Sequence, residues 1–287
     1  MPELPEVEAV ARALRPLVKG RTILRCRVIH AIAARPTSGR GAGRAAALLE
    51  KNARGRKIQG VGRRGKYLLL PLDRGCLILH FKLDGQLIWF PQRKTSGHID
   101  VAFELGRGTL GFVDRRHFGR VQWAGAPEEV PGIRKMGVDP LSPEFTVARL
   151  AATLRASRRP LKALLLDQSK IAGLGNIYAN EAMWRARLNP QRPANRITGD
   201  AARSLHKGIV AVLRRALECC LHPAPDFRDP NWWFQGLETI LAVYGRAGKK
   251  CRRGDGTIQR MVQGRRSHVL VPALPTVAGY LKSEVSD

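Results

Sequence analysis

The sequence contains 287 residues, enough for one large domain or two of ordinary size. Fifty lysines and arginines against 23 aspartates and glutamates give a formal net charge of +27, and 44% of the residues are hydrophobic. This hydrophobic content excludes a disordered polycation. The charge favours a polyanionic partner, nucleic acid before an anionic membrane.

No apolar run approaches the ~18 residues of a membrane span, and the acidic N-terminus is unlike a signal or transit peptide. We therefore expect a soluble intracellular protein, in the cytoplasm or nucleoid of a bacterium or the nucleus of a eukaryote. The cysteines form no CxxC pair, which predicts free thiols in a reducing compartment. They are Cys26, Cys76, Cys219, Cys220 and Cys251.

The chain begins Met-Pro-Glu-Leu-Pro-Glu-Val-Glu, which places Pro2 close to the carboxylates of Glu3 and Glu6. Removal of Met1 would expose the secondary amine of Pro2. An α-amino group has a pKa of about 7.7–8.0, against about 10.4 for lysine, so more of it is unprotonated and able to attack an electrophilic carbon. A neighbouring carboxylate can shuttle the protons. An ordinary helix start is the alternative interpretation.

Apolar residues at helical spacing predict a first helix from residue 5 to about 17. From about 22 to 124, short apolar runs alternate with Gly, Asp and Pro turns, which predicts a sandwich or barrel. Residues 31–44 are expected to form an exposed loop followed by part of a helix. The predicted strands are 23–29, 67–70, 76–81, 86–90 and 99–103.

Residues 125–143 are rich in Pro, Gly and charge, as in a linker. Residues 144–222 are predicted to be mainly helical. Near the end, 256–262 and 266–271 flank a short turn and predict a basic β-hairpin. The expected helices lie around 147–156, 160–169, 177–186 and 199–220.

Four segments in one order carry a specific resemblance: Pro-Glu-Leu-Pro-Glu-Val-Glu at 2–8, Gly-Arg-Arg-Gly-Lys-Tyr-Leu at 62–68, the helical segments 161–168 and 171–181, and Val-Tyr-Gly-Arg at 243–246. Together they resemble the formamidopyrimidine-DNA glycosylase/endonuclease VIII family. The resemblance implies an α+β fold with a helix and two-layer β-sandwich in a catalytic domain, 1–124, and a linker, 125–146. A helix–two-turns–helix DNA-binding domain, 147–235, and a zincless β-hairpin finger with a tail, 236–287, would follow.

The resemblance implies a base-excision enzyme, a bifunctional DNA glycosylase and AP lyase. By analogy, Pro2 attacks C1′ of the damaged nucleoside, and the resulting Schiff base allows β- and δ-elimination without a metal or redox cofactor. Glu3 would protonate the sugar ring oxygen, and Glu6 would orient the N-terminus or simply cap the helix. Lys66 would reach the lesion or its phosphate, a solvated surface lysine being the alternative.

The resemblance also implies DNA-binding residues. Asn176 would contact a phosphate from a glycine-rich turn, with a plain interhelical turn as the alternative. Three side chains would fill the gap left by the flipped base, namely Leu83, Arg116 and Phe118. His117 stands where a second arginine is usual, which puts one phosphate contact in doubt. Leu83 or Phe118 could instead pack a hairpin.

The finger departs from the family's two zinc-binding CxxC pairs. Cys251 remains, but Gly254, Val271 and Leu274 occupy the other ligand positions. The sequence therefore predicts no zinc, with the hairpin held by apolar packing. The packing candidates are Ile258, Val262, Val269 and Val271, the finger arginine is Arg266 with Arg265 as fallback, and Arg252, Arg253 and Arg260 are expected on a solvated basic face.

Arg116 and Phe118 favour oxidised purines, 8-oxoguanine and formamidopyrimidines, as the substrate. An oxidised-pyrimidine glycosylase and a non-catalytic damaged-DNA-binding protein are the alternatives. Residues 226–234 do not match the lesion-covering loop expected there. The expected partner is duplex DNA containing oxidised bases or abasic sites, bound by a monomer.

Overall fold

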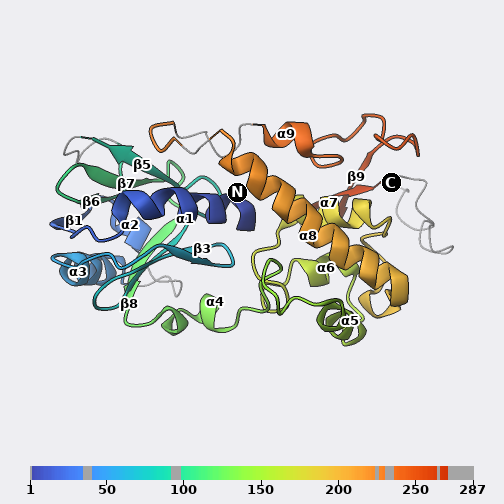
Figure 1. Cartoon of the computed structure of the whole chain (residues 1–287), viewed down its shortest axis with the longest axis horizontal. Helices are drawn as coiled ribbons and strands as arrows, with labels where there is room; N and C mark the ends of the chain where they lie inside the picture. The colour runs from blue at the N-terminus through green and yellow to red at the C-terminus, as the bar shows by residue number, and fades with distance from the viewer. Residues whose placement is uncertain are drawn as a thin grey trace, which may run out of the picture. The chain divides into compact units, whose positions relative to one another are not determined.

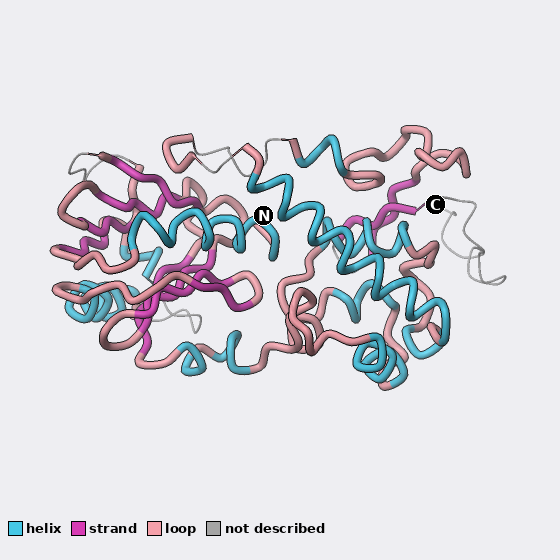
Figure 2. The backbone as a smooth tube through the Cα atoms, viewed as in Figure 1, coloured by secondary structure: helices cyan, strands magenta, loops and turns pink. Residues whose placement is uncertain are grey.

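The computed structural model describes residues 2–34, 41–91, 98–223, 226–229, 236–263 and 266–270, with the backbone alone from 261 onward. Contacts divide the chain into two compact units. One comprises Met1–Met136 with Ala216–Leu237, and the other comprises Gly137–Arg215 with Glu238–Asp287. The strands of the first unit and the helices of the second are distinguished by colour in Figure 2.

The first unit begins with helix α1, Leu4–Val18, which is drawn in dark blue in Figure 1. Its apolar face is buried. Glu3 is its N-cap, and Pro5 lies in the first turn, where a missing N–H costs nothing. Leu4, Val7 and Leu14 recur at helical spacing on the buried face. The predicted first helix is therefore confirmed.

Two antiparallel four-stranded sheets complete the predicted N-terminal architecture. The first has the order β1-β6-β7-β5, and the second has the order β2-β3-β4-β8. The rings of Phe81 and Phe112, from the second and first sheets' segments, stack with centroids 6.2 Å apart. The strands are β1 (Arg25–Val28), β2 (Gly62–Arg64), β3 (Tyr67–Pro71), β4 (Cys76–His80), β5 (Gln86–Phe90), β6 (Val101–Glu104), β7 (Thr109–Val113) and β8 (Arg120–Ala124).

All five predicted strands are present, whereas the periodicity missed β2, β7 and β8. Gly111 interrupts the apolar pattern of β7. The glycine is required there because an added Cβ would lie 2.9 Å from the Phe90 ring. The expected exposed loop at 31–44 was wrong over its first residues. Helix α2, Ala31–Ala34, buries two alanines, and helix α3, Ala42–Ala53, contacts β1 and β8.

The expected linker contains a 3-10 helix, η1 (Pro127–Glu129), and α4 (Pro131–Arg134), both in the first unit. The expected helical region and β-hairpin are confirmed. Their elements are α5 (Val147–Arg155), α6 (Leu161–Leu165), α7 (Asn176–Arg185), η2 (Ala194–Arg196), α8 (Gly199–Leu221), α9 (Leu237–Ile240), β9 (Gln259–Gln263) and β10 (Arg266–Leu270). The last residues of α8 belong to the first unit.

All five cysteines are free thiols, as expected. Among the described residues, no helix combines the length and apolarity needed to cross a membrane.

Candidate active site and nucleic-acid interface

The first three predicted catalytic residues are buried together at the start of α1. Pro2 is buried, and Glu3 and Glu6 are each 1% exposed. The Glu6 carboxylate accepts the Glu3 backbone N–H at 2.8 Å, while the Glu3 side chain accepts from the third helical residue. This capping box fixes the backbone beside Pro2. The helix-capping and orienting interpretations of Glu6 therefore describe the same contact.

The surroundings of Glu6 include the end of α8. Burial raises the pKa of the Cys220 thiol well above its ordinary value, and the nearby carboxylate of Glu6 adds to the shift. The charge of Glu6 is therefore held next to an inert, protonated thiol. Sequence reasoning did not pair these two residues, since 214 positions separate 6 from 220 in the chain.

Lys66 occupies the two-residue turn of the β2–β3 hairpin. Arg64 pairs with Tyr67 across it, and Gly65 has φ +56°, a left-handed conformation that suits glycine. Lys66 is only 8% exposed. The interpretation of Lys66 as a solvated surface lysine is thus wrong.

Arg63 ties this turn to α1. Its Nε donates to Glu8 Oε2 at 2.9 Å, and its Nη1 donates to the Gly65 carbonyl at 3.2 Å. The Arg63 side chain is 7% exposed and that of Glu8 20%. Burial raises the pKa of Glu8, but Arg12 and Arg63 outweigh it and hold that pKa below its ordinary value. Helix α1, which begins two residues after the candidate nucleophile Pro2, is thereby fastened to the turn that carries Lys66.

A second arginine strengthens this junction, because Arg15 donates to the Val61 carbonyl through Nε at 3.0 Å and Nη2 at 2.8 Å. Sequence reasoning missed Glu8, Arg15 and Arg63. Both Glu8 and Arg63 lie inside the segments that carry the resemblance, but nothing in either segment says that the two side chains meet.

His80, at the end of β4, lies among three cations. Its Nδ1 accepts the Lys82 backbone N–H at 3.0 Å, and its ring stands edge-on to Tyr67. Burial lowers the pKa of His80 to about 3, assisted by Lys82, Lys66 and Arg120. Burial and Arg120 also lower the pKa of Lys82. The imidazole is therefore neutral at physiological pH, with its Nε2 as the protonated nitrogen.

The two loops expected to fill a base-sized gap lie together. We call them the Leu83 loop (81–85) and the Phe118 loop (114–119). Leu83 is 37% exposed and Phe118 49%, so neither packs a hairpin core and that alternative is wrong. Arg116 forms an ion pair with Asp84, and its guanidinium lies 5.7 Å from the Phe118 ring centroid. Asp84 was missed by sequence reasoning.

Both loops close on one aromatic ring. An added Cβ at Gly85 would lie 2.9 Å from Phe112 Cζ, and one at Gly119 would lie 2.6 Å from the same atom. Only glycine lets both backbones approach this closely. The ring of Phe112 therefore sets how near the two loops come, and so where Leu83 and Phe118 emerge.

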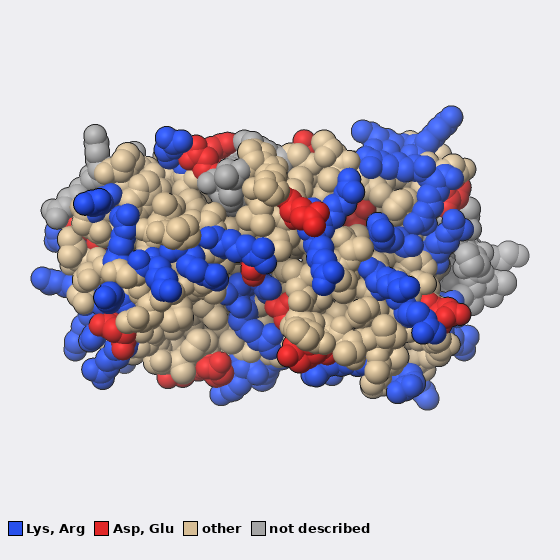
Figure 3. Space-filling model, viewed as in Figure 1, with Lys and Arg blue, Asp and Glu red and all other residues tan. Residues whose placement is uncertain are grey.

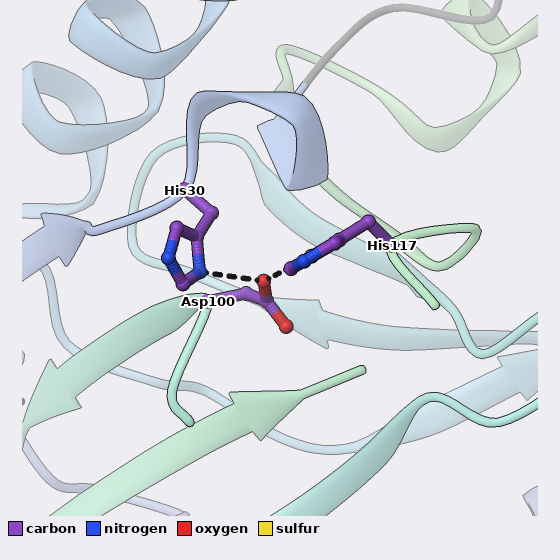
Figure 4. A group of neighbouring side chains, drawn as sticks. All are labelled: His30, Asp100 and His117. Carbon is purple, nitrogen blue, oxygen red and sulfur yellow. Dashed lines mark hydrogen bonds and ion pairs between the residues drawn. The ribbon is translucent and has the colours of Figure 1, made fainter. Parts of the chain in front are cut away.

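His117 lies in the Phe118 loop with a φ of +53°. Its Nδ1 lies 2.8 Å from Asp100 Oδ1, and His30 Nδ1 lies 3.0 Å from the same oxygen (Figure 4). Asp100 is 1% exposed. The sequence indicated that His117 replaces an arginine, but it did not indicate that His30 and Asp100 meet it.

In the second unit, Asn176 is the first residue of α7, preceded by the N-cap Gly175, which has no side chain to cap the helix. The turn before it is braced by Gln168. The Gln168 amide donates to the Leu174 carbonyl at 2.8 Å and accepts the Gly173 N–H at 2.8 Å. Gly173 has φ +82°. The Asn176 Oδ1 atom is buried and has no hydrogen-bond partner among the described residues.

Glu181 of α7 holds the segment that leads to the finger. Its carboxylate accepts three backbone N–H groups, from Ala242 at 2.9 Å, Val243 at 2.9 Å and Tyr244 at 2.8 Å. Glu181 is 4% exposed. Sequence reasoning included Glu181 only as part of a motif and assigned it no contact.

Cys251 is part of a small core at the base of the finger, with Val243 and Ile258. Trp184 Nε1 donates to its sulfur at 3.4 Å, and the thiol faces Asp255 Oδ1 at 3.5 Å. The prediction that Ile258 packs this region is confirmed. The side chains of Val262 and Val269, and residues 271 and 274, lie outside those described.

Arg253 was wrongly expected on a solvated face. Its guanidinium stacks 3.8 Å from the centroid of Trp184, and its Nη1 donates to the Trp184 carbonyl at 2.9 Å. Arg266 begins β10 and pairs with Gln263 of β9, but its side chain is not among those described, and Arg265 lies outside the described residues.

On the face drawn in Figure 3, lysine and arginine predominate over aspartate and glutamate, as a polyanionic partner requires.

The segment 226–234 is described only over 226–229, where Phe227 is buried and its carbonyl accepts the Trp89 N–H at 3.1 Å.

Comparison with known proteins identifies relatives along nearly the whole chain. Residues 1–121 match the formamidopyrimidine-DNA glycosylase N-terminal domain, and 136–221 match the formamidopyrimidine-DNA glycosylase H2TH domain. The chain is 42% identical over 274 residues to the formamidopyrimidine-DNA glycosylase of Thermus thermophilus, covering 93% of this chain and 96% of that one. The corresponding protein of Chloroflexus aurantiacus is 40% identical over 279 residues, covering 95% and 96%. A Lactococcus lactis Fpg mutant in complex with Fapy-dG-containing DNA is 28% identical, with a TM-score of 0.82 over 95% of this chain and 99% of that one.

We predict that Arg63→Met lowers the free energy of unfolding by about 1–3 kcal/mol, because it leaves a mostly buried carboxylate without its best partner. Chemical denaturation measures the loss. Arg12→Met is the matched control, since Arg12 binds the same Glu8 carboxylate from a side chain that is 51% exposed. Its expected cost is below about 1 kcal/mol. Equal losses in the two variants would contradict a special role for Arg63.

We predict that His80 makes the fold less stable as the pH falls. The unfolded chain takes up a proton near pH 6.5, whereas folded His80 does so only near 3. Stability contributed by neutral His80 is therefore complete above about 6.5 and is lost between these values, by at most about 1.4 kcal/mol per pH unit. His80→Asn should unfold with a shallower pH dependence in this window, and substitution of the exposed His98 should leave the wild-type slope. A wild-type slope in His80→Asn would refute the assignment.

Proposed function

The chain belongs to the formamidopyrimidine-DNA glycosylase family, and we propose from this premise how its own residues carry out the work of a bifunctional DNA glycosylase and AP lyase on oxidised purines in duplex DNA. The observation that carries the proposal is the start of α1. There a capping box between Glu3 and Glu6 holds the backbone beside the buried Pro2, and the helix is fastened to the turn that carries Lys66.

The proposed reaction begins with Pro2, freed of Met1. Its amine nitrogen attacks C1′ of the damaged nucleoside, and the glycosidic bond breaks as the base leaves with a proton. Glu3 protonates the ring oxygen, the sugar opens, and a Schiff base forms as an iminium at C1′. The iminium acidifies the C2′ proton, so its removal expels the 3′ phosphate and a second elimination expels the 5′ phosphate. Every step uses groups of the protein and DNA alone.

The burial of Pro2 supports this chemistry, because it screens the reacting groups from bulk water. The Glu6 carboxylate already accepts the Glu3 backbone N–H, which leaves the Glu3 carboxylate to transfer protons. Lys66, on the fastened turn, would bind the phosphate beside the lesion together with the neighbouring cations Lys82 and Arg120.

We propose that the Leu83 and Phe118 loops enter the duplex where the base has left. Leu83 and Phe118 are exposed apolar side chains, which suit insertion into a base stack. Arg116 would exchange Asp84 for the orphaned base. His117, on the same loop, would contact a phosphate in place of the usual arginine.

Asn176 and Arg266 are the proposed phosphate contacts of the second unit. The start of α7 offers backbone N–H groups, and the side-chain NH2 of Asn176 is a further donor for a phosphate oxygen. Arg266 would reach DNA from the first residue of β10. In this proposal, 1–124 supplies catalysis, 147–235 and the finger at 236–287 supply DNA binding, and the protein acts as a monomer on chromosomal DNA.

We further propose that the finger belongs to the zincless kind. Its single cysteine packs with Val243 and Ile258 and faces Trp184 and Asp255, so its sulfur is used in a core. The Arg253 guanidinium stacks over the ring of Trp184. Packing and cation–π stacking would replace the folding energy that zinc gives other fingers.

Borohydride trapping on an 8-oxoguanine duplex tests the catalytic proposal. Wild-type protein should form a covalent adduct, and Pro2→Gly should lose it, with excision reduced at least about 10²-fold, while salt-sensitive binding persists. A parallel thymine-glycol duplex distinguishes the oxidised-pyrimidine alternative, and binding without an adduct would favour the non-catalytic one. Mass spectrometry of active protein that retains Met1 would refute the role of Pro2.

Substitutions at the finger base test the zincless proposal. Cys251→Val should keep DNA binding within about threefold and leave the zinc content per chain unchanged, because only a packed sulfur is replaced. Trp184→Ala should weaken DNA binding more strongly, since it removes the shared contact of Cys251 and Arg253. A zinc atom lost specifically in Cys251→Val would overturn the proposal.

A further inference from the structure

Two buried carboxylates at the base of the Phe118 loop lack a lysine or arginine partner among the described residues. Asp100 is 1% exposed and Asp114 is 2% exposed. They are adjacent, because the Asp114 backbone N–H donates to Asp100 Oδ2 at 2.6 Å. The Asp114 carboxylate accepts the backbone N–H groups of Arg116 and Gly119. Buried carboxylates are stable when they are paired with a cation or bound to a metal. Here no lysine or arginine of the described residues supplies that cation.

Two imidazoles face this pair of charges. His30 and His117 direct Nδ1 at the same Asp100 oxygen, and the three candidate ligand atoms lie within 4.8 Å of one another (Figure 4). They come from three separate segments: the residue before α2, the residue before β6, and the Phe118 loop. The histidine side chains are 45% and 39% exposed, so water can complete a coordination shell.

We propose that His30, Asp100 and His117 bind one divalent transition-metal ion, such as Zn²⁺. Two imidazole nitrogens, one carboxylate oxygen and a water match the three-ligand open sites of zinc. The nitrogen ligands select against Mg²⁺ and Ca²⁺, which prefer oxygen. Binding replaces the two Nδ1–H donors. Each Nδ1 proton leaves to solvent or to Nε2, so both imidazoles coordinate through Nδ1 while the ion offsets the carboxylates.

The net charge of +27 opposes any cation at long range, so the site depends on the local charge of Asp100 and Asp114. Three of the five cysteines compete poorly for the ion. Burial raises the pKa of Cys76 to about 12 and raises those of Cys26 and Cys220 further, so these thiols stay protonated.

The consequence for DNA rests on the proposed function. His117 adjoins Arg116 and Phe118, so an ion on its Nδ1 would fix the left-handed backbone that presents both side chains. The metal would thus join the Phe118 loop to Asp100, and the Nε2 atom of His117 would remain available to the phosphate. The assay for the ion needs no DNA, so failure of this inference and failure of the proposed function are distinguishable.

Cobalt(II) is the probe for this site. The full chain, stripped with a chelator and dialysed, is titrated with Co²⁺ and followed by visible d–d absorption. One equivalent should give bands of a four- or five-coordinate ion with nitrogen and oxygen ligands, without the near-ultraviolet thiolate bands that cysteine binding would produce. Zn²⁺ should then displace the cobalt and raise the unfolding temperature.

Three variants assign the ligands. His30→Ala should weaken Co²⁺ binding by more than about tenfold, as should His117→Arg, which keeps a cation beside Asp100 and so protects the fold. His98→Ala, a change at an exposed histidine outside the cluster, should bind like wild type. Failure of the wild-type chain to bind Co²⁺ or Zn²⁺, or undiminished binding in folded His117→Arg, overturns the proposal.

Discussion

The hydrogen bond between Glu6 and the Glu3 backbone is the contact on which the rest of the site depends. Pro2 is the residue before Glu3, so its direction is fixed only if the first helical turn cannot fray. Helix ends ordinarily fray, since their first N–H groups have no partner within the helix. Here both carboxylates are buried, which removes competition from water and makes the capping box rigid. Pro2, which would carry the terminal amine in the proposed reaction, is thereby held in position.

A positioned Pro2 is useful only if Lys66, on the β2–β3 turn, is held equally well. Arg63 provides this, because one guanidinium binds both the Glu8 carboxylate and the Gly65 carbonyl. Its planar donors can do so at once, whereas the ammonium of a lysine could not hold both directions as firmly. The position of Lys66 relative to α1 is therefore set by a mostly buried ion pair, while its own backbone bends through the left-handed Gly65.

The sequence predicted those parts of the molecule that depend on local pattern. Helical spacing identified α1, α5, α7 and α8, and the motif order identified the family. Strands β2 and β7 were missed because three residues rich in arginine and a strand with a central glycine show no apolar alternation. Strand β8 does alternate, with Val121 and Trp123 as its apolar positions, and was overlooked. Contacts such as Glu8 with Arg63, Asp84 with Arg116 and Glu181 with 242–244 join segments far apart in sequence. A single sequence contains no signal for such pairs.

The two proposed interfaces with DNA would solve different physical problems. Side chains that insert into a duplex must be exposed to water beforehand, and the first unit limits that cost by supporting Leu83 and Phe118 on loops that close on Phe112 and by pairing Arg116 with Asp84. The second unit must instead hold backbone N–H groups and a hairpin in place. It does so with side-chain acceptors and donors that act on backbone, Gln168 at the turn and Glu181 at the finger lead-in. Because Glu181 and Trp184 lie on the helix that begins at Asn176, the turn before α7 and the base of the finger share one element, on which the proposed zincless finger would rest.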